Sequence, residues 1–125
     1  MAHELAARLD ARRAAESAAA RRLVESFVER ARERGLAPVP LRVRAYGGSG
    51  SYRTPLRGWY LRADRTAAVG EDGEFYVLTA PRSLRARLAG TTPVPSDPPL
   101  VLGAGGRDGE SVDLDVALER ALRAS

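Results

Sequence analysis

The sequence predicts a single α+β domain: a long N-terminal helix, an antiparallel sheet of four to five strands, and a short helix and a C-terminal helix packed on the sheet. Three observations support this prediction. Residues 2–34 contain neither Gly nor Pro and include ten Ala. From Leu41 the apolar residues change to strict alternation, and residues 112–122 return to helical spacing. Since 125 residues suffice for only one sizeable core, we expect one domain over residues 1–125.

The first helix is predicted to have two different halves. Gly35 is placed to end it, and the two prolines that follow prevent its continuation. The only apolar residues among positions 10–19 are Ala, which lie among charged side chains. Residues 1–20 are therefore predicted to project from the domain, where they bind a partner helix, self-associate or remain mobile. The second half should pack on the domain, because it has an apolar stripe at helical spacing: Ala20, Leu23, Val24, Phe27, Val28 and Ala31.

An antiparallel meander is predicted after this helix. Leu41, Val43 and Ala45 alternate with polar residues, as in a strand with one buried face. Trp59 and Leu61 likewise alternate with polar residues, which predicts a second strand with one buried face. The predicted strands begin at Leu41 and run over residues 57–62, 66–69 and 74–79, with a hairpin turn at residues 70–73.

The C-terminal third is predicted to add two helices and a strand. Pro81 should begin a short helix with Leu84 and Leu88 on one side and Gly90 at its end. Residues 91–99 hold four Pro and are predicted to be an extended connector. The remaining predicted elements are a buried strand at residues 100–102 that adds to the sheet, a glycine-rich turn at residues 103–109, and a final helix from about residues 112–113.

The core is predicted from these apolar faces, with Trp59 as its main aromatic residue. The predicted core residues are Leu23, Val24, Phe27, Val28, Leu41, Val43, Trp59, Leu61, Val69, Phe75, Val77, Leu100, Leu102, Leu114, Leu118 and Leu122.

The composition excludes several kinds of chemistry. The chain has no Cys, so disulfides, thiolate metal sites and cysteine nucleophiles are absent. His3 is its only His, which argues against a Ser-His-Asp triad or a His-based metal site. We expect no metal and no cofactor. We find no secretory signal and no apolar stretch of membrane-spanning length, so a cytoplasmic location and no membrane partner are expected.

The basic residues are unevenly distributed along the chain. All 20 of them are Arg, and Lys, Asn, Gln and Ile are absent, a pattern typical of GC-rich coding that weakens any functional argument from the choice of Arg over Lys. Residues 41–90 hold nine Arg and only four acidic residues, whereas the last third of the chain is acidic. An excess of this kind indicates an anionic partner or a solvated surface.

Arg and Tyr interleave in this basic region, as they do in surfaces that combine phosphate contacts with base stacking. If these side chains share the outer sheet face or its edge, they form a nucleic-acid-binding surface. A wet sheet face in an Arg-only chain would contain the same residues. The candidate site residues are Arg42, Arg44, Tyr46, Tyr52, Arg53, Arg57, Tyr60 and Arg62.

Two weaker candidates are interpreted structurally. The segment Gly47-Gly48-Ser49-Gly50-Ser51 lacks a phosphate-loop signature and opens no helix, so it is predicted to connect strands. Acidic residues near turns match no calcium-loop pattern and are predicted to serve turns and helix caps: Asp64, Glu71, Asp72, Glu74, Asp108, Glu110, Asp113 and Asp115.

The sequence therefore favours a non-enzymatic binding or adaptor protein that acts through protein–protein contacts or self-association of the N-terminal helix. The alternative is a nucleic-acid-binding module that uses the Arg and Tyr surface. A carboxylate-dependent enzyme is the third possibility, and it requires a pocket with at least two converging carboxylates.

Overall fold

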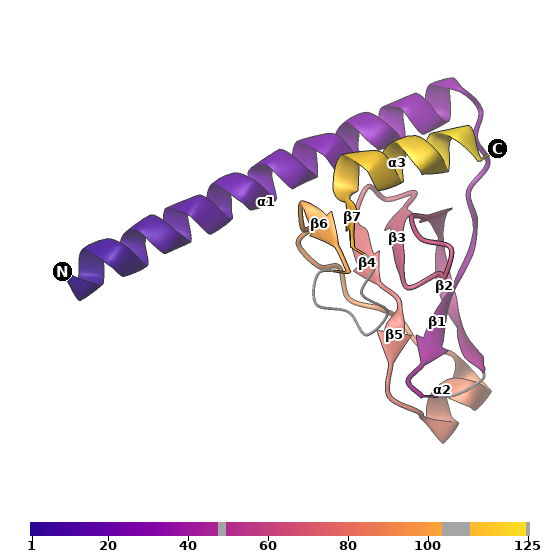
Figure 1. The fold of residues 1–125 in the computed structure, drawn as a ribbon. Coiled ribbons are helices and arrows are strands. Elements are labelled where there is room, and N and C mark those ends of the chain that lie inside the picture. The colour runs from indigo at the N-terminus through magenta and orange to yellow at the C-terminus, as the bar shows by residue number, and fades with distance from the viewer. Residues whose placement is uncertain (48–49, 104–110, 125) are drawn as a thin grey trace.

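The computed structural model describes residues 1–47, 50–103 and 111–124, and it has the predicted α+β fold (Figure 1). The elements in chain order are α1 (Ala2–Glu33), β1 (Val39–Ala45), β2 (Ser51–Tyr60), β3 (Ala67–Gly70), β4 (Phe75–Val77), β5 (Thr79–Ala80), α2 (Leu84–Ala89), β6 (Val101–Leu102), β7 (Val112–Asp113) and α3 (Leu114–Arg123).

The main sheet has five strands in the order β4-β3-β2-β1-β5, and it closes on itself. Its two edge strands, β4 and β5, are consecutive in the chain, with only Leu78 between them. The Leu78 N–H donates to Thr66 O at 2.8 Å, and the Arg44 N–H donates to Leu78 O at 2.8 Å, so this residue joins both edges. Three strand pairings are antiparallel, as predicted, but β1 and β5 are parallel. The sheet is therefore mixed, and the predicted antiparallel pairing holds for three of its four strand pairs.

The inner face of the closed sheet forms a core of its own. Leu41, Ala68 and Leu78 come from different parts of the sheet, yet they pack in one cluster and are at most 1% exposed. Of the helices in the described residues, only α2 reaches this cluster, through Ala86. The curvature of the sheet therefore buries these side chains, since residues of β1 and β4 meet across the interior.

The outer face packs against two helices. Trp59, Val69 and Phe75 lie side by side on β2, β3 and β4 and belong to the cluster that contains the buried residues of α1 and α3. The rings of Phe27 and Trp59 meet edge to face, with centroids 5.6 Å apart, and the Trp59 indole N–H donates to Leu36 O at 3.1 Å. The predicted docking of the second half of the first helix is confirmed.

Most predicted core residues are buried. Leu23 is half-buried against the core that α1 and α3 share, and two others are exposed. Val77 is 50% exposed and Leu100 is 37% exposed, so both predictions were wrong. Val77 lies on the outer face of an edge strand, beyond the helices, whereas the next residue, Leu78, is fully buried inside. Alternation along this apolar run leaves one large side chain in solvent.

The predicted strand at residues 100–102 does not join the main sheet. Instead, Val101–Leu102 pairs with Val112–Asp113 in a separate two-stranded sheet, and α3 begins only at Leu114. Its predicted buried face is confirmed, because Leu114, Leu118 and Leu122 are at most 4% exposed.

Helix α1 extends well beyond α3 and the sheet (Figure 1). It has 32 residues, which corresponds to a length of about 48 Å. Every residue from 2 to 16 is exposed, and the first buried residue is Ala20. The next residue, Arg21, forms an ion pair with Asp97 at 2.7 Å, so α1 leaves the rest of the structure just before this position. We call residues 2–16 the arm.

Helix α2 lies at the end of the sheet far from α1 (Figure 1). The Ser83 hydroxyl caps it by accepting from the Ala86 N–H, and Gly90 ends it with φ +78°. Leu84 and Leu88, predicted to share one side, are both 73% exposed, because this helix packs through Ala86 instead.

Candidate functional site

Four Arg side chains lie on the open part of the outer sheet face. Arg42 and Arg44 alternate with the buried residues of β1, and Arg53 and Arg57 alternate likewise on β2. Arg42 and Arg53 are register partners across the two strands, where like charges repel. We call Arg42, Arg44, Arg53 and Arg57 the basic face.

The charges of the basic face are not neutralised by carboxylates in the described part of the chain. Arg42 donates to the Ser51 hydroxyl at 2.7 Å. The other three donate to backbone carbonyl oxygens, namely Arg44 to Asp64 O, Arg53 to Leu88 O and Arg57 to Pro38 O. None of the four forms an ion pair among the described residues. The surface therefore keeps a positive field that an anionic partner would feel.

Two of the three predicted tyrosines, Tyr52 and Tyr60, do not share this face. Tyr46 is 58% exposed directly after β1. Tyr52 is 7% exposed because its register partner, Val43, points inward. Tyr60 also belongs to the inner cluster, and its hydroxyl accepts from the Arg42 N–H at 2.9 Å. The prediction that Tyr52 and Tyr60 lie with the arginines is corrected, and Tyr46 alone of the three is well exposed for stacking.

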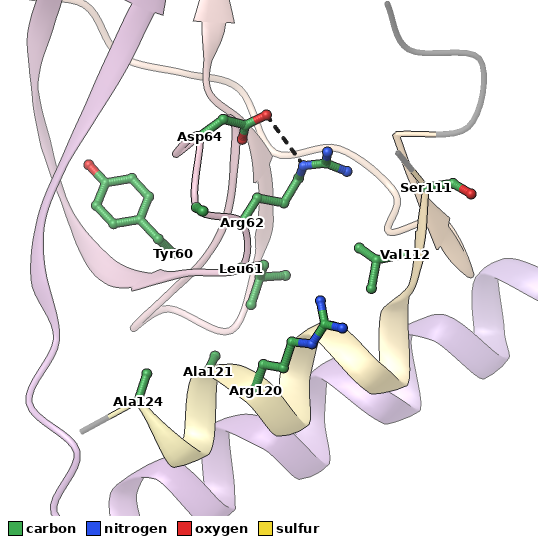
Figure 2. A pocket seen from close by; sticks show the side chains of 10 residues that line it. Tyr60, Leu61, Arg62, Asp64, Ser111, Val112, Arg120, Ala121 and Ala124 are labelled. Carbon is green, nitrogen blue, oxygen red and sulfur yellow. Dashed lines mark ion pairs between the residues drawn. The ribbon is translucent and has the colours of Figure 1, made fainter. Parts of the chain in front are cut away.

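Arg62, the last predicted site residue, lies in a cleft between the end of β2 and α3. Its side chain is 16% exposed, and its Nε is 3.5 Å from Asp64 Oδ2. In Figure 2 the side chain of Arg120 extends from α3 toward the part of the cleft where Arg62 and Val112 lie. Arg62 is thus separated from the basic face.

This cleft has a volume of about 960 Å³ and mixed chemistry. Apolar side chains such as Leu61 and Ala121 line it together with two guanidinium groups and one carboxylate, that of Asp64. It has room for a small molecule with an anionic group and an apolar body. Two converging carboxylates, which a carboxylate-dependent enzyme would require, are not present among its described lining residues.

Asp64 organises the turn after β2. Its Oδ1 accepts from both the N–H and the hydroxyl of Thr66, at 3.0 and 2.7 Å. Burial raises the pKa of Asp64, but the hydrogen bonds from Thr66 and the charge of Arg62 outweigh it and hold the pKa below its usual value. The predicted turn role of this carboxylate is confirmed.

A pH-dependent contribution to stability follows from this lowered pKa. Because the folded pKa lies below the unfolded one, the contribution is present above pH ~4 and is lost as the pH falls through the folded pKa. Asp64→Asn should lower the free energy of unfolding by roughly 0.5–1 kcal/mol at pH 7 and by less at pH 3. Urea titrations at both pH values measure this. Asp97→Asn, at an ion pair that is 75% exposed on the Asp side, is the control, and a loss that does not depend on pH would contradict the assignment.

Two other acidic residues also serve local structure. Asp72 accepts from the Glu74 N–H and from the Tyr76 hydroxyl, and Asp115 accepts from the Val116 N–H. Asp108 and Glu110 lie outside the described residues. Within the described ranges, no group of three or more acidic or His side chains is placed to hold a metal ion.

The segment at residues 47–51 connects β1 to β2 and opens no helix, as predicted, although residues 48–49 lie outside the described part. No helix in the described part of the chain is both long and apolar enough to cross a membrane.

Sequence reasoning missed three basic residues, Arg82, Arg85 and Arg87, on and just before α2. They lie close to the basic face, because the Arg53 guanidinium donates to Leu88 O and the Arg53 carbonyl oxygen accepts from the Thr91 N–H. The signal was the segment Pro81-Arg-Ser-Leu-Arg-Ala-Arg87, which holds three Arg and no acidic residue.

Comparison with known proteins provides no match: no protein-family model, no curated protein and no solved structure is significantly similar to this chain.

Proposed function

We propose that this chain is a non-enzymatic binding protein that acts through protein–protein contacts of its arm, with a second copy of itself as the first partner to test. One observation supports this most directly. About half of a 32-residue helix extends into solvent, fixed at its other half by buried contacts. Isolated helices of about 12–15 residues are marginal in water, so the exposed arm gains stability when a partner covers it.

The arm continues the apolar side that docks α1 on the domain. Leu9 precedes Phe27 by about five full helical turns, so both point in the same direction. Leu5 lies one turn before Leu9, and the two are 61% and 44% exposed. Two exposed leucines on the docking side of a helix are suited to pack against another helix.

The charges of the arm permit contact with a second copy. Residues 2–16 hold three Arg and three acidic residues, whereas the whole chain has a net charge of +4. Two arms can therefore approach without the net repulsion that two basic faces would experience.

Sedimentation velocity over a range of concentrations tests this proposal. The unaltered protein should form dimers, and Leu5→Glu with Leu9→Glu should give monomers, because two charges would be buried unpaired in the contact. The thermal unfolding of the variant should stay unchanged, since both residues are exposed.

The matched control places the same change on α2. Leu84→Glu with Leu88→Glu alters two leucines at the same spacing that are 73% exposed, and it should leave the dimer intact. Pairing through the arm is contradicted if the chain is monomeric at every attainable concentration. It is also contradicted if both double variants dissociate the dimer equally.

A nucleic-acid-binding module is the second candidate, supported by the unneutralised charge of the basic face. Binding to a duplex or single-stranded oligonucleotide should weaken steeply with added salt. Arg42→Ala and Arg53→Ala should each lower the salt slope by about one phosphate contact, measured by fluorescence anisotropy. Arg22→Ala, an exposed α1 residue, is the control. Binding that is absent at low salt, or equally sensitive to Arg22, rejects this candidate.

A further inference from the structure

A second pocket, distinct from the cleft beside α3, lies between the first hairpin and α2. It has a volume of about 420 Å³, and we call it the α2 pocket. Its lining comes from the end of β1, the start of β2, and the segment that enters and forms α2: Ala45, Gly50, Ser51, Tyr52, Arg82, Ser83, Leu84 and Arg87.

The charge of this lining is entirely positive. Arg82 and Arg87 are its two ionised side chains, and neither makes an ion pair or a side-chain hydrogen bond with the described residues. By contrast, the cleft beside α3 already holds an Arg–carboxylate pair, and the pocket beside Trp59 is lined by both Arg32 and Glu71. Of these three pockets, the α2 pocket alone presents cations without a carboxylate.

The neutral polar side chains of the pocket are hydroxyls that already act as acceptors. Ser51 accepts from the Arg42 Nε–H, Tyr52 accepts from the Ser83 N–H, and Ser83 accepts from the Ala86 N–H. Each hydroxyl therefore has its own O–H available to donate. The side chains of the pocket thus offer two guanidinium groups and three hydroxyl donors.

We infer that the α2 pocket binds a phosphate group, as inorganic phosphate or as part of a phosphate ester. A phosphate carries negative charge and presents several acceptor oxygens, so it complements a lining of donors and cations. Arg42 stands next to this pocket because it donates to the lining residue Ser51, and its field adds to the attraction. Arg53 donates to Leu88 O, one residue beyond the lining residue Arg87. The inference does not depend on the arm or on self-association.

Calorimetric titration of the intact protein with inorganic phosphate tests the inference, with sodium chloride of matched ionic strength as the blank. The unaltered protein should bind one phosphate per chain. Arg82→Ala and Arg87→Ala should each weaken binding about tenfold, because each removes charge-assisted hydrogen bonds. All three residues Arg82, Arg85 and Arg87 are exposed, so the variants should fold normally.

Arg85→Ala is the matched control, since Arg85 is on the same helix and carries the same charge but does not line the pocket. It should weaken binding far less than the other two. No phosphate heat above the chloride blank would overturn the inference. An equal loss in all three variants would also overturn it, because a diffuse field rather than a pocket would then hold the anion.

A short oligonucleotide distinguishes the source of the phosphate. If it displaces inorganic phosphate and loses affinity in Arg82→Ala, the group comes from a nucleic-acid backbone. If phosphate binds but the oligonucleotide neither binds nor displaces it, the ligand is a small phosphate ester, and the nucleic-acid candidate fails while the pocket stands.

Discussion

Replacing Phe27 by Ala is expected to lower the free energy of unfolding by about 3–5 kcal/mol, the largest loss that we predict for a side-chain truncation in this chain. Phe27 is 1% exposed, and its ring meets Trp59 edge to face. Its removal leaves a cavity where α1 docks on the outer face of the sheet. Since small domains have a total stability of about 5–15 kcal/mol, a substantial part of the population would unfold on mild heating.

Urea unfolding monitored by Trp59 fluorescence measures this loss. Leu9→Ala, in the exposed half of the same helix, should change the free energy of unfolding by no more than about 0.5 kcal/mol. If Phe27→Ala costs no more than Leu9→Ala, α1 does not dock through this residue. The same result would remove the anchor that the proposed arm requires.

Gly58→Ala is expected to lower the free energy of unfolding by about 3 kcal/mol, at the upper end of overpacking effects. A Cβ at this position would overlap Val69 O and would lie 2.7 Å from Gly70 Cα. Both atoms are backbone atoms of the neighbouring strand β3, so no side-chain rotation relieves the contact. The β2–β3 pairing must separate locally, and Trp59 must shift with it.

The control for this prediction is Gly35→Ala, which tests backbone conformation without crowding. Gly35 has φ +67°, and a Cβ at this position would meet no atom within 4 Å, so its replacement should cost about 1–2 kcal/mol. Equal losses at the two glycines, measured by urea unfolding, would show that steric contact at Gly58 is not the cause.

Local elements were predictable because their causes are local. The first helix was predicted from the absence of Gly and Pro over residues 2–34, and the structure gives Ala2–Glu33. Its end at Gly35 and the turn at residues 70–73 follow from glycines with positive φ. The buried side of α3 follows from leucines at helical spacing, whose burial any docking of an amphipathic helix would require.

The candidate site was only partly predictable. Alternation correctly assigned Arg42 and Arg44 to one face of β1, and Tyr60 to the face opposite Trp59. Alternation within one strand does not predict which of its faces continues into a given face of the neighbouring strand, because that depends on the register of the pairing. Tyr60 therefore joined the inner core, and Arg53 and Arg57 joined the basic face without it.

The amino-acid sequence by itself determined the helices, most of the strands, the two-faced pattern of each strand and the basic character of the middle region. These properties depend on contacts between residues a few positions apart, which periodicity and turn residues specify. The tertiary structure decided the closure of the sheet through Leu78 and the separate pairing of residues 101–102 with 112–113. It also decided that Arg82 and Arg87 line the same pocket as Ser51. Each of these joins distant segments, and their relative energies depend on the packing of the whole domain rather than on any local pattern.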